Sequence, residues 1–189
     1  DEARRAGWNP LGVEPNRWAR RHAPDRLGLP VTATVDELPA RGRIDAFVLL
    51  DVIEHLPEPD RVIFQLAGRL APNGECLIAT PDLESAVARA SGARWYVLRQ
   101  QHAYYFTRRG LRALLGRAAC RETATWPLSR TYTFGYWVER LRDYAPAAHR
   151  VAAPAAAALG LRDLRVACAL GDQIVIRARK HGEAPCRAS

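Results

Sequence analysis

Short apolar runs alternate with amphipathic stretches along the first 80 residues of the chain. The apolar and β-branched runs predict four strands, at residues 11–14, 29–34, 44–50 and 75–80. Helices are predicted between them, at 16–26 and at 61–70, where apolar side chains recur on one stripe. The third strand is apolar almost throughout, so we expect it to be buried on both faces. This alternation is typical of an α/β fold, in which helices wrap a parallel sheet.

The pattern changes after residue 81. Of the 15 aromatic residues, 11 lie within residues 94–144. Helices are predicted at 111–118 and in the alanine-rich stretch 147–159, and a last strand of alternating character at 172–179. The aromatic segment forms either part of an ordinary core or a lid over a site.

The composition fits one cytoplasmic domain. With 189 residues, 48% of them apolar, the chain is long enough to bury a core of its own. No apolar run approaches the roughly 20 residues of a membrane span, and the first residues carry no signal-peptide pattern. The four cysteines lie far apart and form no CxxC pair, which argues against a zinc knuckle and a disulfide framework. We therefore expect a protein of the reducing cytoplasm that does not enter a membrane.

The formal net charge of +8 rests on arginine, because Lys180 is the only lysine. The chain has no methionine and much alanine, which together indicate a GC-rich, bacterial coding bias. The arginines are spread from Arg4 to Arg187 with no run longer than a pair, so they indicate a solvated basic surface rather than a nucleic-acid site. A reading frame would not begin at Asp1, within a predicted helix end, so we expect this sequence to be part of a longer one.

Two segments follow predicted strands and carry polar groups. Glu14 ends the first strand, where a carboxylate can accept hydrogen bonds from both hydroxyls of a ribose. An acid there can equally stabilise the N-terminus of the helix that follows, and spacing alone leaves both interpretations open. Thr34 and Val35 open the polar loop after the second strand, where backbone groups can meet the edge of an adenine.

Residues 50–57, with the sequence LDVIEHLP, form the sharpest candidate site. Asp51 ends the third strand, and Glu54 and His55 follow three and four positions later, so a helical turn would bring all three to one face. Ligands of open α/β sheets bind at this edge, and a histidine there can act as a general base toward a hydroxyl or amine. The alternative is that Glu54 and His55 cap a helix and hold the loop.

These segments give the chain a resemblance to a known enzyme family. It resembles class I S-adenosylmethionine-dependent methyltransferases, in the group of the ubiquinone-pathway O-methyltransferases and the type 11 and type 23 methyltransferases. The matching segments occur in the family's order and are GVEP at 12–15, VDELP at 35–39, ID at 44–45, LDVIEHL at 50–56, RLAPNG at 69–74, ATPD at 79–82, GARW at 92–95, QH at 101–102, YF at 105–106 and GDQIVIRARK at 171–180.

The resemblance implies a fold and a cofactor. The fold would be Rossmann-like, a mostly parallel sheet with helices on both faces and an antiparallel C-terminal strand. The cofactor would be S-adenosylmethionine. Glu14 would bind its ribose, Thr34 and Val35 would line its adenine, and Asp51 would lie beside its methionine part.

The resemblance also implies an acceptor side. His55 and His102 would face the acceptor as the catalytic residues. The methyltransferase domain would span residues 1–182, with a cofactor-binding half at 1–82. An aromatic-rich substrate cap at 83–146 and a C-terminal helix and strand at 147–182 would follow, and 183–189 would be a tail.

The sequence departs from the family at the first strand. The family's first strand ends in a GxGxG loop, and no two glycines of this chain stand two positions apart. We therefore expect the first strand and its loop to precede Asp1. In the family that strand lies between the strand ending at Glu14 and the one ending at Leu50, so the chain as given would bind cofactor poorly.

Two alternatives remain beside methyl transfer to a hydroxyl or amine of a small-molecule or sugar acceptor. A non-catalytic module with the same fold would serve as a partner-binding surface. Some related RNA 2′-O-methyltransferases hold a divalent ion with an acid-x-x-Glu-His set, which Asp51, Glu54, His55 and His102 imitate. Because a mixed carboxylate and imidazole set suits magnesium or manganese only moderately, no metal is included in the predicted site.

Overall fold

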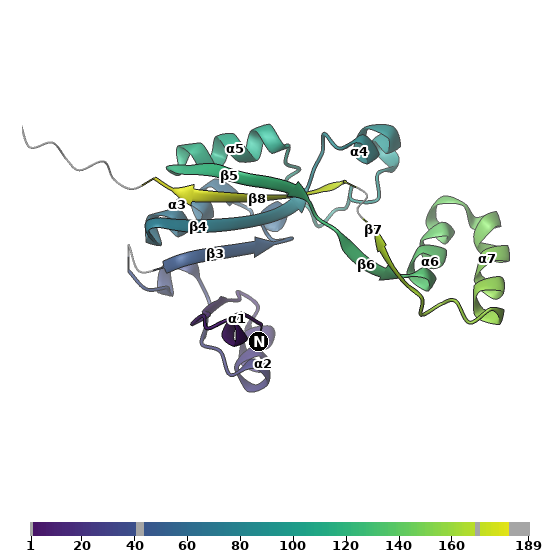
Figure 1. The fold of residues 1–189 in the computed structure, drawn as a ribbon, viewed down its shortest axis with the longest axis horizontal. Coiled ribbons are helices and arrows are strands. Elements are labelled where there is room, and N and C mark those ends of the chain that lie inside the picture. Colours follow the sequence, from purple (N-terminus) through teal and green to yellow (C-terminus); the bar gives the residue numbers. More distant parts are fainter. Residues whose placement is uncertain (1, 41–43, 169–170, 182–189) are drawn as a thin grey trace, which may run out of the picture.

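The computed structural model describes residues 2–40, 44–168 and 171–181, and the expected tail at 183–189 lies outside them. The main sheet has four strands in the order β3 (Ile44–Leu50), β4 (Leu70–Pro81), β8 (Gln173–Lys180) and β5 (Cys120–Pro127) (Figure 1). β3 runs parallel to β4, whereas β8 is antiparallel to both β4 and β5. The expected mostly parallel α/β sheet with an antiparallel last strand is therefore confirmed.

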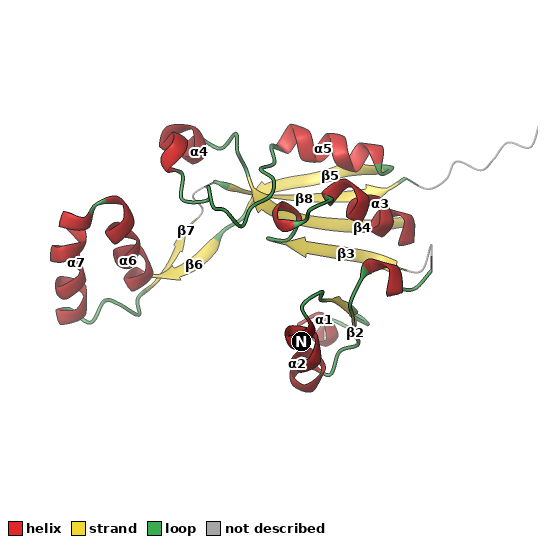
Figure 2. Cartoon of the chain, turned by 180° about the vertical axis from the view of Figure 1, so that it is seen from behind, coloured by secondary structure: helices red, strands yellow, loops and turns green. Residues whose placement is uncertain are grey.

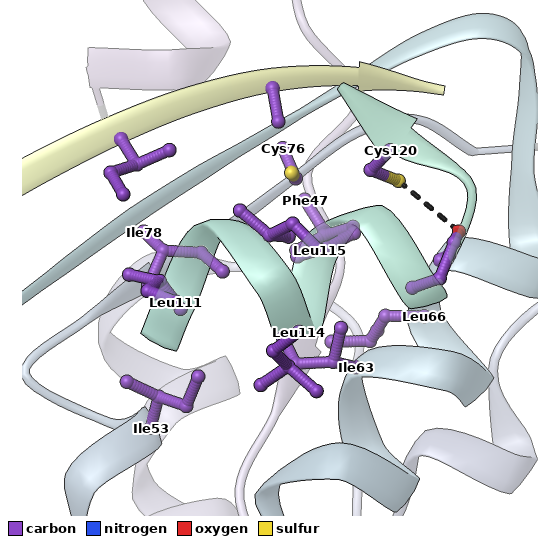
Figure 3. Close-up of a cluster of buried hydrophobic side chains, with 14 of the residues drawn as sticks. Phe47, Ile53, Ile63, Leu66, Cys76, Ile78, Leu111, Leu114, Leu115 and Cys120 are labelled. Carbon is purple, nitrogen blue, oxygen red and sulfur yellow. Dashed lines mark hydrogen bonds between the residues drawn. The ribbon is translucent and has the colours of Figure 1, made fainter. Parts of the chain in front are cut away.

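Helices α3 (Pro59–Arg69) and α5 (Arg108–Arg117) lie on the same face of the main sheet (Figure 2). Their apolar stripes pack against side chains of β3, β4 and β8 in one buried cluster (Figure 3). Its fully buried members include Ile53, Ile63, Leu70, Ile78, Leu111, Leu115 and Ile176. Each such side chain stabilises the fold by about 1.5–3 kcal/mol relative to an exposed one. This cluster holds the two helices on the sheet.

The expectation that β3 is buried on both faces is wrong. Phe47 is its only buried residue, and Val48 and Leu50 are 54% and 53% exposed. Within the described part of the chain, β3 is an edge strand that pairs with β4 alone, and the core cluster covers the face that carries Phe47. The apolar composition of the strand did not reveal this one-sided environment.

The connection from α3 to β4 is tighter than predicted. The helix begins with Pro59 in its first turn and ends at Arg69, because Leu70 already belongs to β4 and is fully buried. At the bend Asn73 has a φ of 65°, in the left-handed region. A Cβ atom at Gly74 would come within 2.9 Å of the Ala71 carbonyl oxygen, so this turn requires glycine.

The N-terminal segment forms a small unit of its own. It contains α1 (Glu2–Arg5), β1 (Gly12–Val13), α2 (Arg17–Leu27), β2 (Val31–Thr32) and the 3₁₀ helix η1 (Val35–Glu37). β1 and β2 pair in parallel as a sheet separate from the main one. η1 anchors the unit, because Val35 and Leu38 pack against the main core and Asp36 Oδ1 accepts a hydrogen bond of 2.9 Å from Gln65 on α3.

A second unit is inserted between β5 and β8. It consists of β6 (Arg130–Thr133), α6 (Phe134–Tyr144), α7 (Pro146–Ala158) and β7 (Arg165–Cys168), and we call it the β6–β7 unit. Its two strands pair antiparallel, and its helices pack on each other beyond the end of the main sheet (Figure 1). No helix in the described ranges is long and apolar enough to cross a membrane.

The segment expected as a cap, residues 83–146, is thus shared between two parts of the fold. α4 (Ala86–Ser91) and the 3₁₀ helix η3 (Gly92–Arg94) lie beside the end of the main sheet (Figure 2). α5 and β5 belong to the main sheet and its core, whereas β6 and α6 belong to the β6–β7 unit. The aromatic residues of the segment therefore occupy different environments.

Ion pairs connect α5 to β5 through Glu122, whose side chain is largely buried. Glu122 on β5 lies 2.8 Å from Arg108 Nη2 and accepts two hydrogen bonds from Arg112, of 2.8 and 3.1 Å. The hydrogen bond from Arg112, with a further one from Arg108, holds the pKa of the Glu122 carboxyl below its ordinary value. Unfolding removes these contacts, so the stability they provide depends on pH.

We expect Glu122→Gln to lower the free energy of unfolding by about 1 kcal/mol near neutral pH. Because the folded-state pKa is the lower one, this contribution is present above the unfolded pKa of about 4.3 and is lost as pH falls through the folded pKa. Urea titrations across this range should show the difference shrinking toward acid. Glu58→Gln, which removes an exposed pair with Arg61, is the control and should have a smaller effect. A difference that stays constant with pH would contradict the ion-pair role of Glu122.

Candidate functional site

Asp51 lies at the carboxyl end of β3, where the main sheet meets the β6–β7 unit. Its φ of 51° is left-handed, and its N–H donates to the Ala79 carbonyl of β4 at 3.0 Å. Its carboxylate forms an ion pair with Arg130 of β6 and accepts a hydrogen bond of 3.2 Å from Gln173 Nε2 of β8. Asp51 thus joins three strands that lie far apart in the sequence.

Glu54 is a buried acid in the next turn, the 3₁₀ helix η2 (Ile53–His55). It is 2% exposed, and its Oε2 accepts a hydrogen bond of 3.0 Å from Thr80 Oγ1. Its backbone carbonyl accepts the N–H groups of Ala103 and Tyr104 at 2.9 and 3.1 Å. Burial raises the pKa of the Glu54 carboxyl. Glu54 therefore holds η2 against β4 and against the segment that carries His102.

His55 and His102 lie side by side at this end of the sheet. Their ring centroids are 4.7 Å apart, with the planes at 73°. His55 Nδ1 lies 2.9 Å from the Gln101 carbonyl oxygen, which can only accept, so Nδ1 carries the proton and Nε2 remains an acceptor. Burial and then the neighbouring His55 lower the pKa of His102, which therefore stays neutral to a lower pH than an ordinary histidine.

The turn after β3 does not bring Asp51, Glu54 and His55 to one face. Asp51 stands outside η2 in a left-handed conformation and turns toward Arg130, while Glu54 points into the core. The chain instead brings together Glu54, His55 and His102, whose potential ligand atoms lie within 4.8 Å of one another. Such a set could hold a transition metal, but burial raises the pKa of its carboxyl group, and this group already accepts a hydrogen bond from Thr80.

The other predicted cofactor residues lie in the N-terminal unit. Glu14 follows β1, and its N–H donates to the Thr32 carbonyl at 2.9 Å. Its Oε1 accepts the Asn16 N–H at 2.8 Å, which leaves a carboxylate with about four acceptor sites able to bind hydroxyl groups as well. Thr34 precedes η1 and donates to Glu37 Oε1 at 3.2 Å, and Val35 packs on the core.

Glu14, Thr34 and Val35 thus share the carboxyl end of the β1–β2 pair, whereas Asp51 lies at the carboxyl end of β3. The chemistry of this donor set fits the ribose and adenine parts of a nucleoside cofactor, because it combines a hydroxyl-binding acid with loop backbone. The glycine loop that contacts the remaining part of the cofactor in the family is not among these residues.

Sequence reasoning missed three residues of the site. Arg130 and Gln173 contact Asp51 from 79 and 122 positions away. Arg130 lies in no recognised motif, and the motif at 171–180 that contains Gln173 does not indicate this contact. Thr80 had a signal, since it ends a predicted strand within the motif ATPD at 79–82. A polar residue at the end of a buried strand should have been included among the candidates.

Solved structures share the fold of this chain at low sequence identity. An S-adenosylmethionine-dependent methyltransferase from Archaeoglobus fulgidus has a TM-score of 0.60 and 15% identity, over 95% of this chain and 79% of its own. One from Thermotoga maritima has a TM-score of 0.58 and 18% identity, over 94% and 75%. The 1,6-didemethyltoxoflavin N1-methyltransferase of Burkholderia thailandensis, which contains bound S-adenosylhomocysteine, has a TM-score of 0.50 and 19% identity, over 93% and 62%.

The sequence comparisons place the chain in a family. None of the curated proteins matches it in sequence. Residues 1–121, about two thirds of the chain, match the methyltransferase-domain family. This stretch runs from the N-terminal unit through Asp51, Glu54, His55 and His102 to the start of β5, and it ends before Arg130 and Gln173. The chain therefore belongs to the methyltransferase-domain family, as a class I S-adenosylmethionine-dependent methyltransferase.

Proposed function

We propose that this domain transfers a methyl group from S-adenosylmethionine to a hydroxyl or amine of a small-molecule or sugar acceptor. The observation that carries the proposal is the pair His55 and His102 beside Asp51 at the carboxyl end of β3. This is the edge at which open α/β sheets bind their ligands. We further infer a cytoplasmic protein, since Cys76 and Cys120 are buried free thiols.

The cofactor would be held by the residues that follow β1, β2 and β3. Glu14 would accept hydrogen bonds from the ribose hydroxyls, and Thr34 and Val35 would border the adenine. Asp51 would lie beside the methionine part, with its charge oriented by Arg130 and Gln173. When bound, the cofactor supplies an electrophilic methyl group on a sulfonium. The contribution of the protein is to position the acceptor in line with that methyl group.

The histidines would remove the proton that the acceptor loses. His55 Nε2 is the acceptor atom, because Nδ1 is fixed by the Gln101 carbonyl. His102 packs against that ring at 4.7 Å and is kept neutral by burial, so it does not repel a proton on His55 as a cation would. General bases of this kind accelerate reactions by about 10²–10⁴-fold.

The proposed role of Glu14 is tested by binding. We expect Glu14→Ala to weaken S-adenosylhomocysteine binding to the native protein by about 10–100-fold, because a charged group loses its hydrogen bonds. Titration calorimetry measures this directly. Glu75→Ala is the control, since it removes a carboxylate of β4 that pairs with Arg179 and lies opposite Ala46, away from the carboxyl end of β3. Equal affinities would remove Glu14 from the site, and no binding by the unsubstituted native protein would favour the non-catalytic module.

The proposed base is tested by turnover, once a panel of hydroxyl and amine compounds has yielded an acceptor. We expect His55→Gln to lower kcat by roughly 10²-fold while the affinity for S-adenosylhomocysteine stays level. His22→Gln removes an exposed histidine of α2 and should leave kcat unchanged. If His55→Gln retains its turnover but unfolds at a lower temperature, His55 holds the loop and is not the base.

The pH dependence of kcat tests the role of His102. Because the pKa of His102 is lowered, this histidine should stay neutral, and should not repel a proton on His55, down to a pH below the ordinary histidine pKa of about 6.5. We expect kcat to fall on the acid side. Because a neutral His102 exerts no charge on the base, His102→Gln should leave the midpoint of this limb in place. A midpoint that shifts in His102→Gln would show that His102 carries charge in this pH range.

A further inference from the structure

Two adjoining pockets open between α6 and the segment that follows α4. They have volumes of about 270 Å³ and 760 Å³ and share Tyr96, Arg140 and Tyr144, and we call them the inner and the outer part of one pocket. The predicted site residues do not line it. The two parts differ in chemistry, because the inner one is walled by aromatic rings and the outer one by arginines.

The inner part is shaped for a flat ring. Tyr132 of β6 and Tyr136 of α6 are stacked, with centroids 4.6 Å apart and planes at 12°. Trp137 stands edge-on to both, with its centroid 5.4 Å from Tyr132 and 5.5 Å from Tyr136. A planar aromatic ligand can stack on such walls or meet them edge-to-face, which adds about 0.5–1.5 kcal/mol per ring pair to the burial of its surface.

The outer part attracts negative charge. Arg94, Arg99 and Arg140 line it, against Asp143 as the only acid of the lining, which lies 3.6 Å from Arg140 Nη1 in a partly exposed ion pair. Arg140 is half-buried, and its guanidinium lies over the rings of Tyr96 and Tyr136, 5.6 and 5.4 Å from their centroids. Because this arginine already occupies the tyrosine faces, a cationic ligand would be repelled there, whereas a carboxylate or phosphate would gain a charge-assisted hydrogen bond.

The pocket adjoins the candidate methyl-transfer site along two connections. Tyr132 stands two residues after Arg130 on the same face of β6, about 7 Å along the strand, and Arg130 pairs with Asp51. Tyr96 donates a hydrogen bond to the buried Asp172, whose neighbour Gln173 also contacts Asp51. A ring bound against Tyr132 would therefore lie next to the carboxyl end of β3.

We propose that this pocket binds a planar aromatic compound that carries an oxyanion, either a carboxylate or a phosphate, and that this compound is the methyl acceptor. The ring lies against Tyr132, Tyr136 and Trp137, and the oxyanion faces Arg140, with Arg94 and Arg99 beyond it. The claim that this ligand is the methyl acceptor rests on the proposed methyltransferase function. The claim that the pocket binds such a ligand is independent of that function.

Three probes of one shape separate charge from packing. Benzoate, benzamide and benzamidine are planar and nearly isosteric, and they carry a negative, a neutral and a positive group. We expect benzoate to bind with a Kd below about 1 mM, benzamide about 10-fold more weakly or worse, and benzamidine not measurably. Titration calorimetry of the native protein gives the affinities. Phenyl phosphate is the fourth probe, and whether it or benzoate binds more tightly decides between phosphate and carboxylate.

Variants locate the binding. Arg140→Gln, and the double variant of Arg94→Gln with Arg99→Gln, should each weaken benzoate binding by about 10-fold or more, whereas benzamide binding should change little. Arg94 and Arg99 are exposed, so the double variant should fold even if replacement of the half-buried Arg140 destabilises the protein. Arg89→Gln, an exposed arginine of α4 outside the pocket lining, is the matched control and should leave benzoate binding unchanged.

The two proposals can fail separately. If the native protein binds S-adenosylhomocysteine but binds the three isosteres alike, binds benzamidine best or binds none of them, the oxyanion pocket is wrong and the methyltransferase remains. If benzoate binds and depends on the arginines while S-adenosylhomocysteine does not bind, the pocket stands and the methyltransferase proposal fails. Equal loss of benzoate affinity in Arg89→Gln would also overturn the pocket.

Discussion

The buried side chain of Glu54 holds together the segments that form the candidate site. Its carboxyl group is 2% exposed and accepts a hydrogen bond from Thr80, and burial raises its pKa. The carbonyl of the same residue accepts the N–H groups of Ala103 and Tyr104. His55 directly follows Glu54, and His102 directly precedes Ala103, whose N–H donates to the Glu54 carbonyl. The contact between the two histidines therefore depends on this arrangement.

The ion pair between Asp51 and Arg130 has a comparable role at the next boundary. It connects the end of β3 to β6, and β6 carries Tyr132 into the wall of the aromatic pocket. Both side chains are 35% exposed, so the pair contributes less to stability than to the position of the β6–β7 unit. A change at Asp51 would therefore disturb the carboxyl end of β3 and the aromatic pocket together.

The sequence predicted the elements with strong local patterns. β3, α3, α5, α7 and β8 lie within a few residues of their predicted bounds, because apolar periodicity and proline or glycine signals define them. β5, β6, β7 and α6 were not predicted, since β5 alternates weakly and the other three are stabilised by contacts within their own unit. The same limit applies to the site: His55 and His102 lay in recognisable motifs, whereas Arg130 and Tyr132 take their roles from tertiary contacts that no local pattern records.

The central claim is that the cofactor binds at the carboxyl ends of β1, β2 and β3, and hydrogen exchange on the native protein tests it most directly. Addition of S-adenosylhomocysteine should slow exchange of the amides around Glu14, Val35 and Asp51 together, while exchange in the part of β4 near Glu75 stays unchanged. Protection confined to one of these three segments, or spread evenly over the main sheet, would contradict the account.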